Sequence, residues 1–275
     1  MKKLIFLVLL CTSFFNYADE HEYSYVDVGE NKLAYLCKGE GELTALMIAG
    51  MGLNAHDTYK NTFHNAEPEG FKLCLFDRAG TGKSYAKQRK VRSISELAVE
   101  MEAFAEKAGF KQLILVPHSF GGFVARAYAH RNPDSVKAIL FVDAAHESWY
   151  QDMKESMSAK AWKTMDWIMD WEKTTNSLED FAEASSHSKI YELKPETEVV
   201  VLSRGIPHVS IRQTGMAYKD VDAYDNSWNR SQEKLKMVSQ NVTYEKMKYA
   251  SHLFDQTDPW IVLEHIDRLA KSKIK

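Results

Sequence analysis

The stretch LILVPHSFGG, residues 113–122, decides the fold. It opens with four consecutive apolar residues, which are typical of a strand buried on both faces of a sheet. Residues 120–130 form a helix-like segment that ends before Asn132-Pro133. A serine in a tight turn between a buried strand and a helix exposes its hydroxyl above the sheet, beside the positive end of the helix dipole. Ser119 is therefore the candidate nucleophile.

Seven further segments predict strands. Residues 23–28 and 32–37 alternate apolar and polar side chains and are separated by Gly29-Glu30-Asn31, which predicts a β-hairpin. The other five are mostly apolar runs without such alternation, at residues 44–49, 72–76, 138–142, 198–202 and 242–247. Runs of this kind favour a parallel sheet that is covered on both faces.

Helix-like segments alternate with these strands. Ser93 and Glu96 have the spacing of a capping box, and Asp258-Pro259 is typical of a helix start. The alternation predicts an α/β fold with a mainly parallel eight-stranded sheet and helices on both faces. Residues 148–193 contain no predicted strand, so we expect a small helical cap there. The tryptophans and methionines of this cap pack it onto the core, line an apolar pocket, or do both.

The serine motif in this setting resembles the G-x-S-x-G nucleophile elbow of the α/β-hydrolase family, over almost all of residues 19–275. Pro117 stands where the family usually has the first glycine. The sequence AGMG at residues 49–52 resembles the family's oxyanion loop. The resemblance implies that the backbone N–H groups of Met51 and Phe120 bind the carbonyl oxygen of the tetrahedral intermediate.

A second family-like turn, DRAGTGKS, covers residues 77–84. It resembles the structural D-R-x-G-x-G-x-S turn of the family, which lies near the active site. It also imitates the end of a P-loop, but Asp77 occupies the position where a P-loop needs its first glycine. We therefore do not expect nucleotide binding at this turn.

In this family the catalytic histidine follows the last strand, and His252 occupies that place. The acid is harder to assign. The loop after the strand at residues 198–202 is the commoner position for it, but that loop has no carboxylate. Asp143, at the end of the preceding strand, is the preferred candidate to orient the imidazole. Asp222 and Asp225 remain alternatives.

The N-terminus has the pattern of a secretory signal. Lys2 and Lys3 precede a short apolar run, and Ala18 is a small residue before an acidic pair. This pattern predicts a signal peptide of residues 1–18, with the α/β-hydrolase domain at residues 19–275 and its cap within it. We expect a protein exported to the periplasm or the medium. No later stretch is long and apolar enough for a membrane anchor.

Two cysteines, Cys37 and Cys74, follow the predicted cleavage site. In an oxidising compartment they could form one disulfide. Both lie in predicted strands, so two buried free thiols are an equal alternative. The sequence leaves this choice open, as it does the oligomeric state.

Composition and motifs exclude several classes of function. The chain has 275 residues and a formal net charge of −3, without the basic surface of a nucleic-acid-binding protein. No metal-ligand cluster or dinucleotide motif is present, so no cofactor or metal is expected. With the resemblance, we expect a serine hydrolase that cleaves small to medium apolar carboxylic esters. The alternatives are an amidase, thioesterase, lactonase, acyltransferase or cofactor-free haloperoxidase, or a ligand-binding protein with slow turnover. Epoxide hydrolases and dehalogenases of this family have aspartate in place of Ser119.

Overall fold

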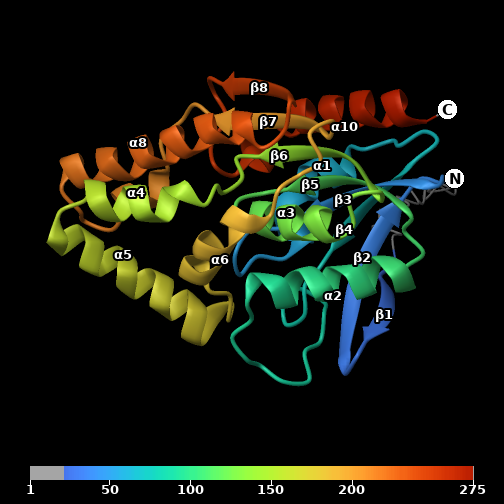
Figure 1. Cartoon of the computed structure of the whole chain (residues 1–275), viewed down its shortest axis with the longest axis horizontal. Helices are drawn as coiled ribbons and strands as arrows, with labels where there is room; N and C mark the ends of the chain where they lie inside the picture. Colours follow the sequence, from blue (N-terminus) through green and yellow to red (C-terminus); the bar gives the residue numbers. More distant parts are fainter. Residues whose placement is uncertain (1–21, 275) are drawn as a thin grey trace, which may run out of the picture.

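Eight strands form one sheet in the computed structural model, which describes residues 22–274 (Figure 1). The strand order is β1-β2-β4-β3-β5-β6-β7-β8, with antiparallel pairing of β1 with β2 and of β2 with β4 and parallel pairing elsewhere. The predicted mainly parallel eight-stranded sheet is thus confirmed. Its strands are β1 (Ser24–Val28), β2 (Asn31–Lys38), β3 (Leu43–Ile48), β4 (Lys72–Phe76), β5 (Gln112–Pro117), β6 (Val136–Val142), β7 (Glu198–Arg204) and β8 (Asn241–Met247).

The main helices follow the strands. They are α1 (Ala55–His64), α2 (Ile94–Lys107), α3 (Gly121–Arg131), α8 (Tyr218–Lys234) and α10 (Pro259–Lys273), with short turns α7 (Val209–Arg212), η3 (Leu235–Met237) and α9 (Phe254–Thr257). The capping box at Ser93 and Glu96 is formed as predicted. Asp258 is at the N-cap of α10, but its side chain makes no capping hydrogen bond there.

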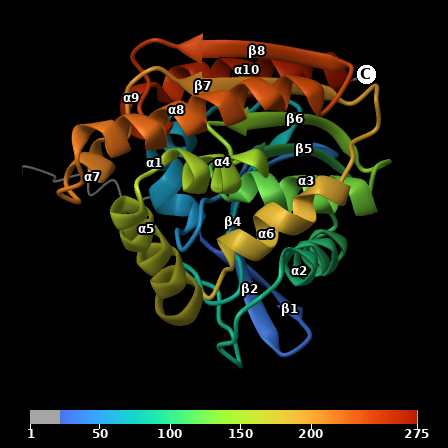
Figure 2. The ribbon, with the colours of Figure 1, turned by 60° about the vertical axis from the view of Figure 1, so that its left-hand side comes forward.

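Helices cover both faces of the sheet (Figures 1 and 2). Leu46 and Ile48 of β3 belong to the core beneath α2, α3 and α8, whereas Ala45 and Met47 belong to the core beneath α1 and α10. Successive strand residues point to opposite faces, so a strand between two apolar cores needs an unbroken apolar run. This explains why the central strands could be predicted from such runs.

A helical segment joins β6 to β7. It comprises α4 (Ser148–Ser156), α5 (Ala159–Trp171), the π-helical turn η1 (Glu172–Asn176), α6 (Phe181–His187) and η2 (Ser188–Ile190). In both views α4 lies beside α8. Trp149 is buried edge-on against Phe181 and Trp228, whereas Trp167 is 66% exposed. Some aromatic side chains of the segment therefore pack onto the core and others face solvent.

A disulfide joins Cys37 of β2 to Cys74 of β4, which are register partners in the sheet, so the structure favours the bridge over two free thiols. No helix between residues 22 and 274 is long and apolar enough to cross a bilayer. The predicted signal peptide, residues 1–18, lies outside the described residues.

Candidate active site

The predicted site residues follow the ends of neighbouring parallel strands. Ser119 lies after β5, Asp143 after β6, His252 after β8, and Met51 after β3. The carboxyl ends of parallel strands meet at one edge of a sheet, where their loops come together. Residues that are far apart in the chain therefore lie close together at this edge.

Ser119 occupies a tight turn between β5 and α3. Its φ is +50°, in the left-handed region that few residues other than glycine adopt. Gly121 allows the turn to approach β3, because a Cβ there would lie 2.7 Å from the carbonyl oxygen of Ile48. Pro117 ends β5, and strand pairing continues beyond it, where the N–H of His118 donates to Ile48 at 2.9 Å. Proline in place of the usual glycine is thus compatible with the turn.

The imidazole of His252 bridges the serine and a carboxylate. Its Nε2 lies 3.2 Å from Oγ of Ser119, and its Nδ1 lies 2.6 Å from Oδ2 of Asp143. Since the carboxylate accepts, Nδ1 carries a proton and Nε2 faces the hydroxyl as an acceptor. This is the hydrogen-bond order that a base needs to take a proton from a serine.

Of the three candidate acids, the structure brings Asp143 into contact with the imidazole. Asp143 is fully buried and has a φ of +40°. Asp225 lies on α8, and its Oδ1 accepts from Arg204 rather than from His252. Asp222, on the same helix, is exposed. Asp143, His252 and Ser119 together form a Ser–His–Asp relay.

The carboxylate of Asp143 accepts four hydrogen bonds. Oδ1 accepts from the backbone N–H of Arg204 at 3.1 Å and from Nε1 of Trp228 at 3.0 Å, while Oδ2 accepts from Nη1 of Arg204 at 2.9 Å and from His252. Burial alone would raise the pKa of Asp143, but the charge of Arg204 and these hydrogen bonds hold that pKa well below its ordinary value. Asp143 is therefore an anion at neutral pH.

His252 is neutral at neutral pH. Burial lowers its pKa from the ordinary 6.5 to about 3, although the hydrogen bond with Asp143 acts in the opposite direction. The rings of His118 and His208 lie 4.6 and 4.8 Å from the ring of His252, and their charged forms would lower the pKa further. An unprotonated Nε2 is thus available to accept a proton from Ser119.

His118 takes part in the site in a way that the sequence analysis missed. The family resemblance implies that this residue is the usual neighbour of the nucleophile and points away from it. In the structure its Nε2 lies 2.7 Å from the carbonyl oxygen of His252 and donates to it, because a carbonyl only accepts. Burial lowers the pKa of His118, so the ring is neutral and its buried Nδ1 has no hydrogen-bond partner within residues 22–274. His118 thus holds the loop that presents the base.

The two predicted oxyanion donors are placed at the ends of β3 and β5. Within residues 22–274, the backbone N–H groups of Met51 and Phe120 make none of the structure's hydrogen bonds. The N–H groups that follow them are occupied: Gly52 donates to Glu179 at 3.1 Å, and Gly121 donates to His118 at 2.8 Å. Two backbone donors without an internal acceptor are what an oxyanion hole requires.

A buried ion pair supports the oxyanion loop. Arg78, from the DRAGTGKS turn, donates to the carbonyl oxygens of Ala49 at 2.8 Å and Gly50 at 2.7 Å. Its Nε lies 2.6 Å from Oε1 of Glu179, which precedes α6 and is fully buried. Since Gly52 donates to the same glutamate, the ion pair ties the loop to the helical segment between β6 and β7. No sequence motif predicts this role for Glu179.

A family model for the alpha/beta hydrolase fold matches residues 46–187, about half of the chain. The match includes the oxyanion loop, the DRAGTGKS turn, the elbow and Asp143. The chain belongs to the α/β-hydrolase fold family. The sequence resemblance to this family is thereby confirmed.

Curated α/β-hydrolase relatives match shorter regions. A pimeloyl-[acyl-carrier protein] methyl ester esterase from Proteus mirabilis is 32% identical over 124 residues, which is 43% of this chain and 45% of the relative. A 1-acylglycerol-3-phosphate O-acyltransferase from Arabidopsis thaliana is 29% identical over 131 residues, or 45% of this chain and 31% of the relative. The matched region thus covers less than half of these relatives.

Solved structures agree on the fold across most of this α/β hydrolase. A thermophilic esterase from Thermogutta terrifontis gives a TM-score of 0.61 at 16% identity, over 92% of this chain and 100% of that one. An epoxide hydrolase mutant from Bacillus megaterium gives 0.64 at 15% identity, over 90% and 100% of the two chains. At this identity the likeness shows the fold alone.

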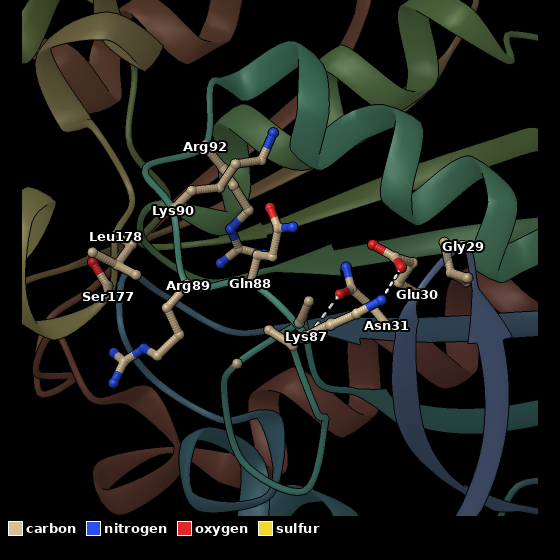
Figure 3. Close-up of a pocket in the computed structure, with 14 residues that line it drawn as sticks. Gly29, Glu30, Asn31, Lys87, Gln88, Arg89, Lys90, Arg92, Ser177 and Leu178 are labelled. Carbon is tan, nitrogen blue, oxygen red and sulfur yellow. Dashed lines mark hydrogen bonds and ion pairs between the residues drawn. The ribbon is translucent and has the colours of Figure 1, made fainter.

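A cavity of about 330 Å³ lies outside the relay (Figure 3). The turn at residues 29–31, the basic segment 87–92 and residues 177–178 line it, and no relay residue does. Carboxylates pair with three of its four cations, in the ion pairs Lys87–Glu30, Lys90–Glu96 and Arg92–Glu100. The positive charge of the segment is therefore largely offset.

Proposed function

We propose that this α/β hydrolase is an exported serine hydrolase that cleaves carboxylic esters through an acyl-enzyme intermediate. The observation that carries the proposal is the hydrogen-bonded order of Ser119, His252 and Asp143, with distances of 3.2 and 2.6 Å. The positive φ of Ser119, which presents its hydroxyl at the sheet edge, supports the same assignment.

In the proposed reaction, Oγ of Ser119 attacks the ester carbonyl carbon while Nε2 of His252 takes the hydroxyl proton. Asp143 stabilises the imidazolium that forms, and the N–H groups of Met51 and Phe120 bind the oxyanion. Collapse of the tetrahedral intermediate breaks the ester C–O bond, and His252 returns the proton to the departing alcohol. Water then repeats these steps on the acyl-enzyme and releases the acid and free Ser119.

The choice of esters rests on relatives and on the elbow residue. One curated relative is named as a methyl ester esterase and one solved neighbour as a thermophilic esterase. A serine nucleophile forms an acyl-enzyme from a carbonyl substrate, whereas epoxide hydrolases of this family use aspartate at the same place. Half-buried Met51 follows β3 and packs against the hydrophobic core, and an apolar side chain at this place favours an ester with an apolar part.

The proposed export rests on two observations. The first 18 residues have the pattern of a secretory signal, and Cys37 and Cys74 form a disulfide. Disulfides persist in oxidising compartments and are rare in the cytosol, so the bridge supports a periplasmic or extracellular protein. N-terminal sequencing of the exported protein is expected to begin at Asp19; a sequence beginning at Met1 would contradict the cleavage.

A fluorophosphonate probe and a series of p-nitrophenyl esters test the hydrolase function. We expect the wild-type protein to be labelled at Ser119 and to hydrolyse short and medium acyl chains. Ser119→Ala is expected to lose the label and at least about 10³-fold of kcat, because members of a catalytic triad act as a unit. Ser148→Ala, which alters a serine after β6, is the matched control and should keep both. Full turnover by Ser119→Ala would refute the assignment.

A further inference from the structure

A buried arginine lies directly behind the Ser–His–Asp relay. Arg204 ends β7, next to the loop where the family usually has its acid but where this chain has none. Its side chain is 2% exposed, and Nη1 lies 2.9 Å from Oδ2 of Asp143, the same oxygen that His252 contacts. Its Nη2 lies 2.8 Å from Oδ1 of Asp225 on α8. Arg204 thus sits between two carboxylates, one inside the relay and one outside it.

The charges of this cluster depend on the protonation of His252. With a neutral imidazole, two carboxylates face one guanidinium and the net charge is −1. Protonation of His252 during the reaction brings the cluster to neutrality. Opposite charges that are buried within about 4 Å interact far more strongly than in water. The stability of the imidazolium must therefore depend on the ion pairs that Arg204 makes with Asp143 and with Asp225.

The two residues outside the relay act on it differently. The backbone N–H and the guanidinium of Arg204 each donate one of the four hydrogen bonds that Asp143 accepts, so replacing the side chain removes one hydrogen bond together with the positive charge. Within residues 22–274, the carboxylate of Asp225 makes no hydrogen bond to Ser119, His252 or Asp143. It accepts from Arg204 at 2.8 Å and from the backbone N–H of His208 at 3.0 Å. Neutralising Asp225 therefore changes the charge at the relay while leaving the four hydrogen bonds of Asp143 in place.

Other titratable groups also face the base. His118, from the elbow, and His208, from the loop after β7, lie with their rings within 5 Å of the His252 ring. Tyr224 of α8 packs against His208, and burial raises the pKa of its hydroxyl well above the ordinary value, so it stays neutral. The charge of Asp255 in α9 acts on His118, and its carboxylate accepts from the backbone N–H groups of Asn61 and Thr62 in α1. Both histidines are neutral at neutral pH because burial lowers their pKa values.

We propose that Arg204 and Asp225 are positioning residues that set the proton affinity of the Asp143–His252 pair, Arg204 lowering it and Asp225 offsetting part of that effect. The proposal rests on the hydrolase function proposed above. It assigns a role to Asp225, which the sequence offered as an alternative acid: the residue acts on the acid through Arg204 instead of replacing it.

The pH dependence of kcat/KM for a p-nitrophenyl ester tests this, because its acid limb reports the protonation of the free enzyme's base. Arg204→Gln removes the positive charge, so the imidazolium is more stable and the acid limb should move to higher pH by about one unit. Asp225→Asn removes a negative charge, so the limb should move to lower pH. Arg204→Lys keeps the charge and should restore most of the wild-type profile.

Asp222→Asn is the matched control, because it makes the same charge change at an exposed position of α8. A surface charge is screened by solvent, so this variant should shift the acid limb by less than about 0.2 pH unit. A merely structural role would lower kcat without moving the limb in opposite directions. Shifts of the same sign in Arg204→Gln and Asp225→Asn, or a shift in Asp225→Asn no larger than in the control, would overturn the proposal. If Arg204→Gln does not fold, Asp225→Asn against the control decides alone.

Nuclear magnetic resonance separates this proposal from the hydrolase function. The ring protons of His252, assigned by their loss in His252→Gln, report its titration without any substrate. The same downward shift is expected in Asp225→Asn relative to Asp222→Asn. If no fluorophosphonate labels the protein and the protein cleaves no ester, the proposed function is wrong. The titration of His252 then still supports or overturns the role of Arg204 and Asp225.

Discussion

Backbone strain coincides with the reactive residues. Ser119, Asp143 and Leu178 have a positive φ, and two of these three non-glycine residues belong to the relay. Such a conformation costs on the order of 1 kcal/mol and persists only where the surroundings hold it. At Ser119 the carbonyl oxygen accepts from the N–H of Gly122 at 3.0 Å and from that of Ala145 at 2.8 Å. The segments after β5 and β6 therefore hold each other in place, with the nucleophile on one and the acid on the other.

His118 offers a test of how the base is held. His118→Leu would remove the donor to the carbonyl oxygen of His252, which should lower the free energy of unfolding by about 0.5–1.5 kcal/mol. We expect kcat to fall by about tenfold or more, because the imidazole no longer keeps its position between Ser119 and Asp143. His118→Gln has a side-chain N–H2 near the position of Nε2 and should retain most of the activity. Equal losses in the two variants would show that ring packing, and not the hydrogen bond, matters.

Much of the site could be predicted from single residues, and some of it could not. Ser119 and His252 have local signals, a strand–turn–helix motif and a place after the last strand. Asp143 was preferred over Asp225 because the loop after β7 lacks a carboxylate. The role of Arg204 had no such signal: it depends on the side-by-side packing of β6, β7 and α8, which no short stretch of sequence contains.

Strands that are buried on both faces could be predicted more easily than helices that are buried on one side. The central parallel strands are mostly apolar and could be predicted from that pattern, whereas β8 has polar residues and is only partly buried. No helix was predicted at α8, although Val221, Tyr224 and Trp228 are buried at helical spacing. Most other residues of α8 are polar, because only one of its sides meets the core, and this weakens the apolar signal. The spacing i, i+3, i+7 was the signal that could have located it.

The connection between the oxyanion loop and the helical segment can be tested at Glu179. Glu179→Gln removes the charge that pairs with buried Arg78 and weakens the acceptor of the Gly52 N–H. An unpaired buried arginine destabilises a fold by about 3–5 kcal/mol. We therefore expect a lower free energy of unfolding in urea and a lower kcat, with the KM for p-nitrophenyl esters changed little.

The control for this prediction is Glu192→Gln, which makes the same change at an exposed position after η2. It should alter neither the free energy of unfolding nor kcat. If Glu179→Gln unfolds at the same urea concentration as this control, the buried ion pair does not hold the loop. If it is destabilised but keeps full kcat, the pair supports the fold without positioning the oxyanion donors.

Across the whole molecule, the strands of the sheet differ in how completely they are packed. Its central strands are covered by a core on each face, whereas β1 and β2 form an antiparallel edge whose β1 residues are largely exposed or half-buried. Edge strands have fewer packing contacts and open more readily than central ones. The disulfide is at this place: it ties β2 to β4, where the antiparallel edge joins the parallel part of the sheet.

This position predicts what reduction of the bridge does. The disulfide closes a loop of 37 residues, and in the chain-entropy model it disfavours the unfolded state by about 3–4 kcal/mol. Reducing the wild-type protein should therefore lower its free energy of unfolding by roughly that amount. The relay residues follow β5, β6 and β8, away from the β1–β2 side of the sheet, so ester hydrolysis below the unfolding transition should persist. The double variant Cys37→Ala, Cys74→Ala should have the same free energy of unfolding as the reduced wild type, and reductant should not change it. A wild-type protein whose unfolding is indifferent to reductant would contradict the prediction.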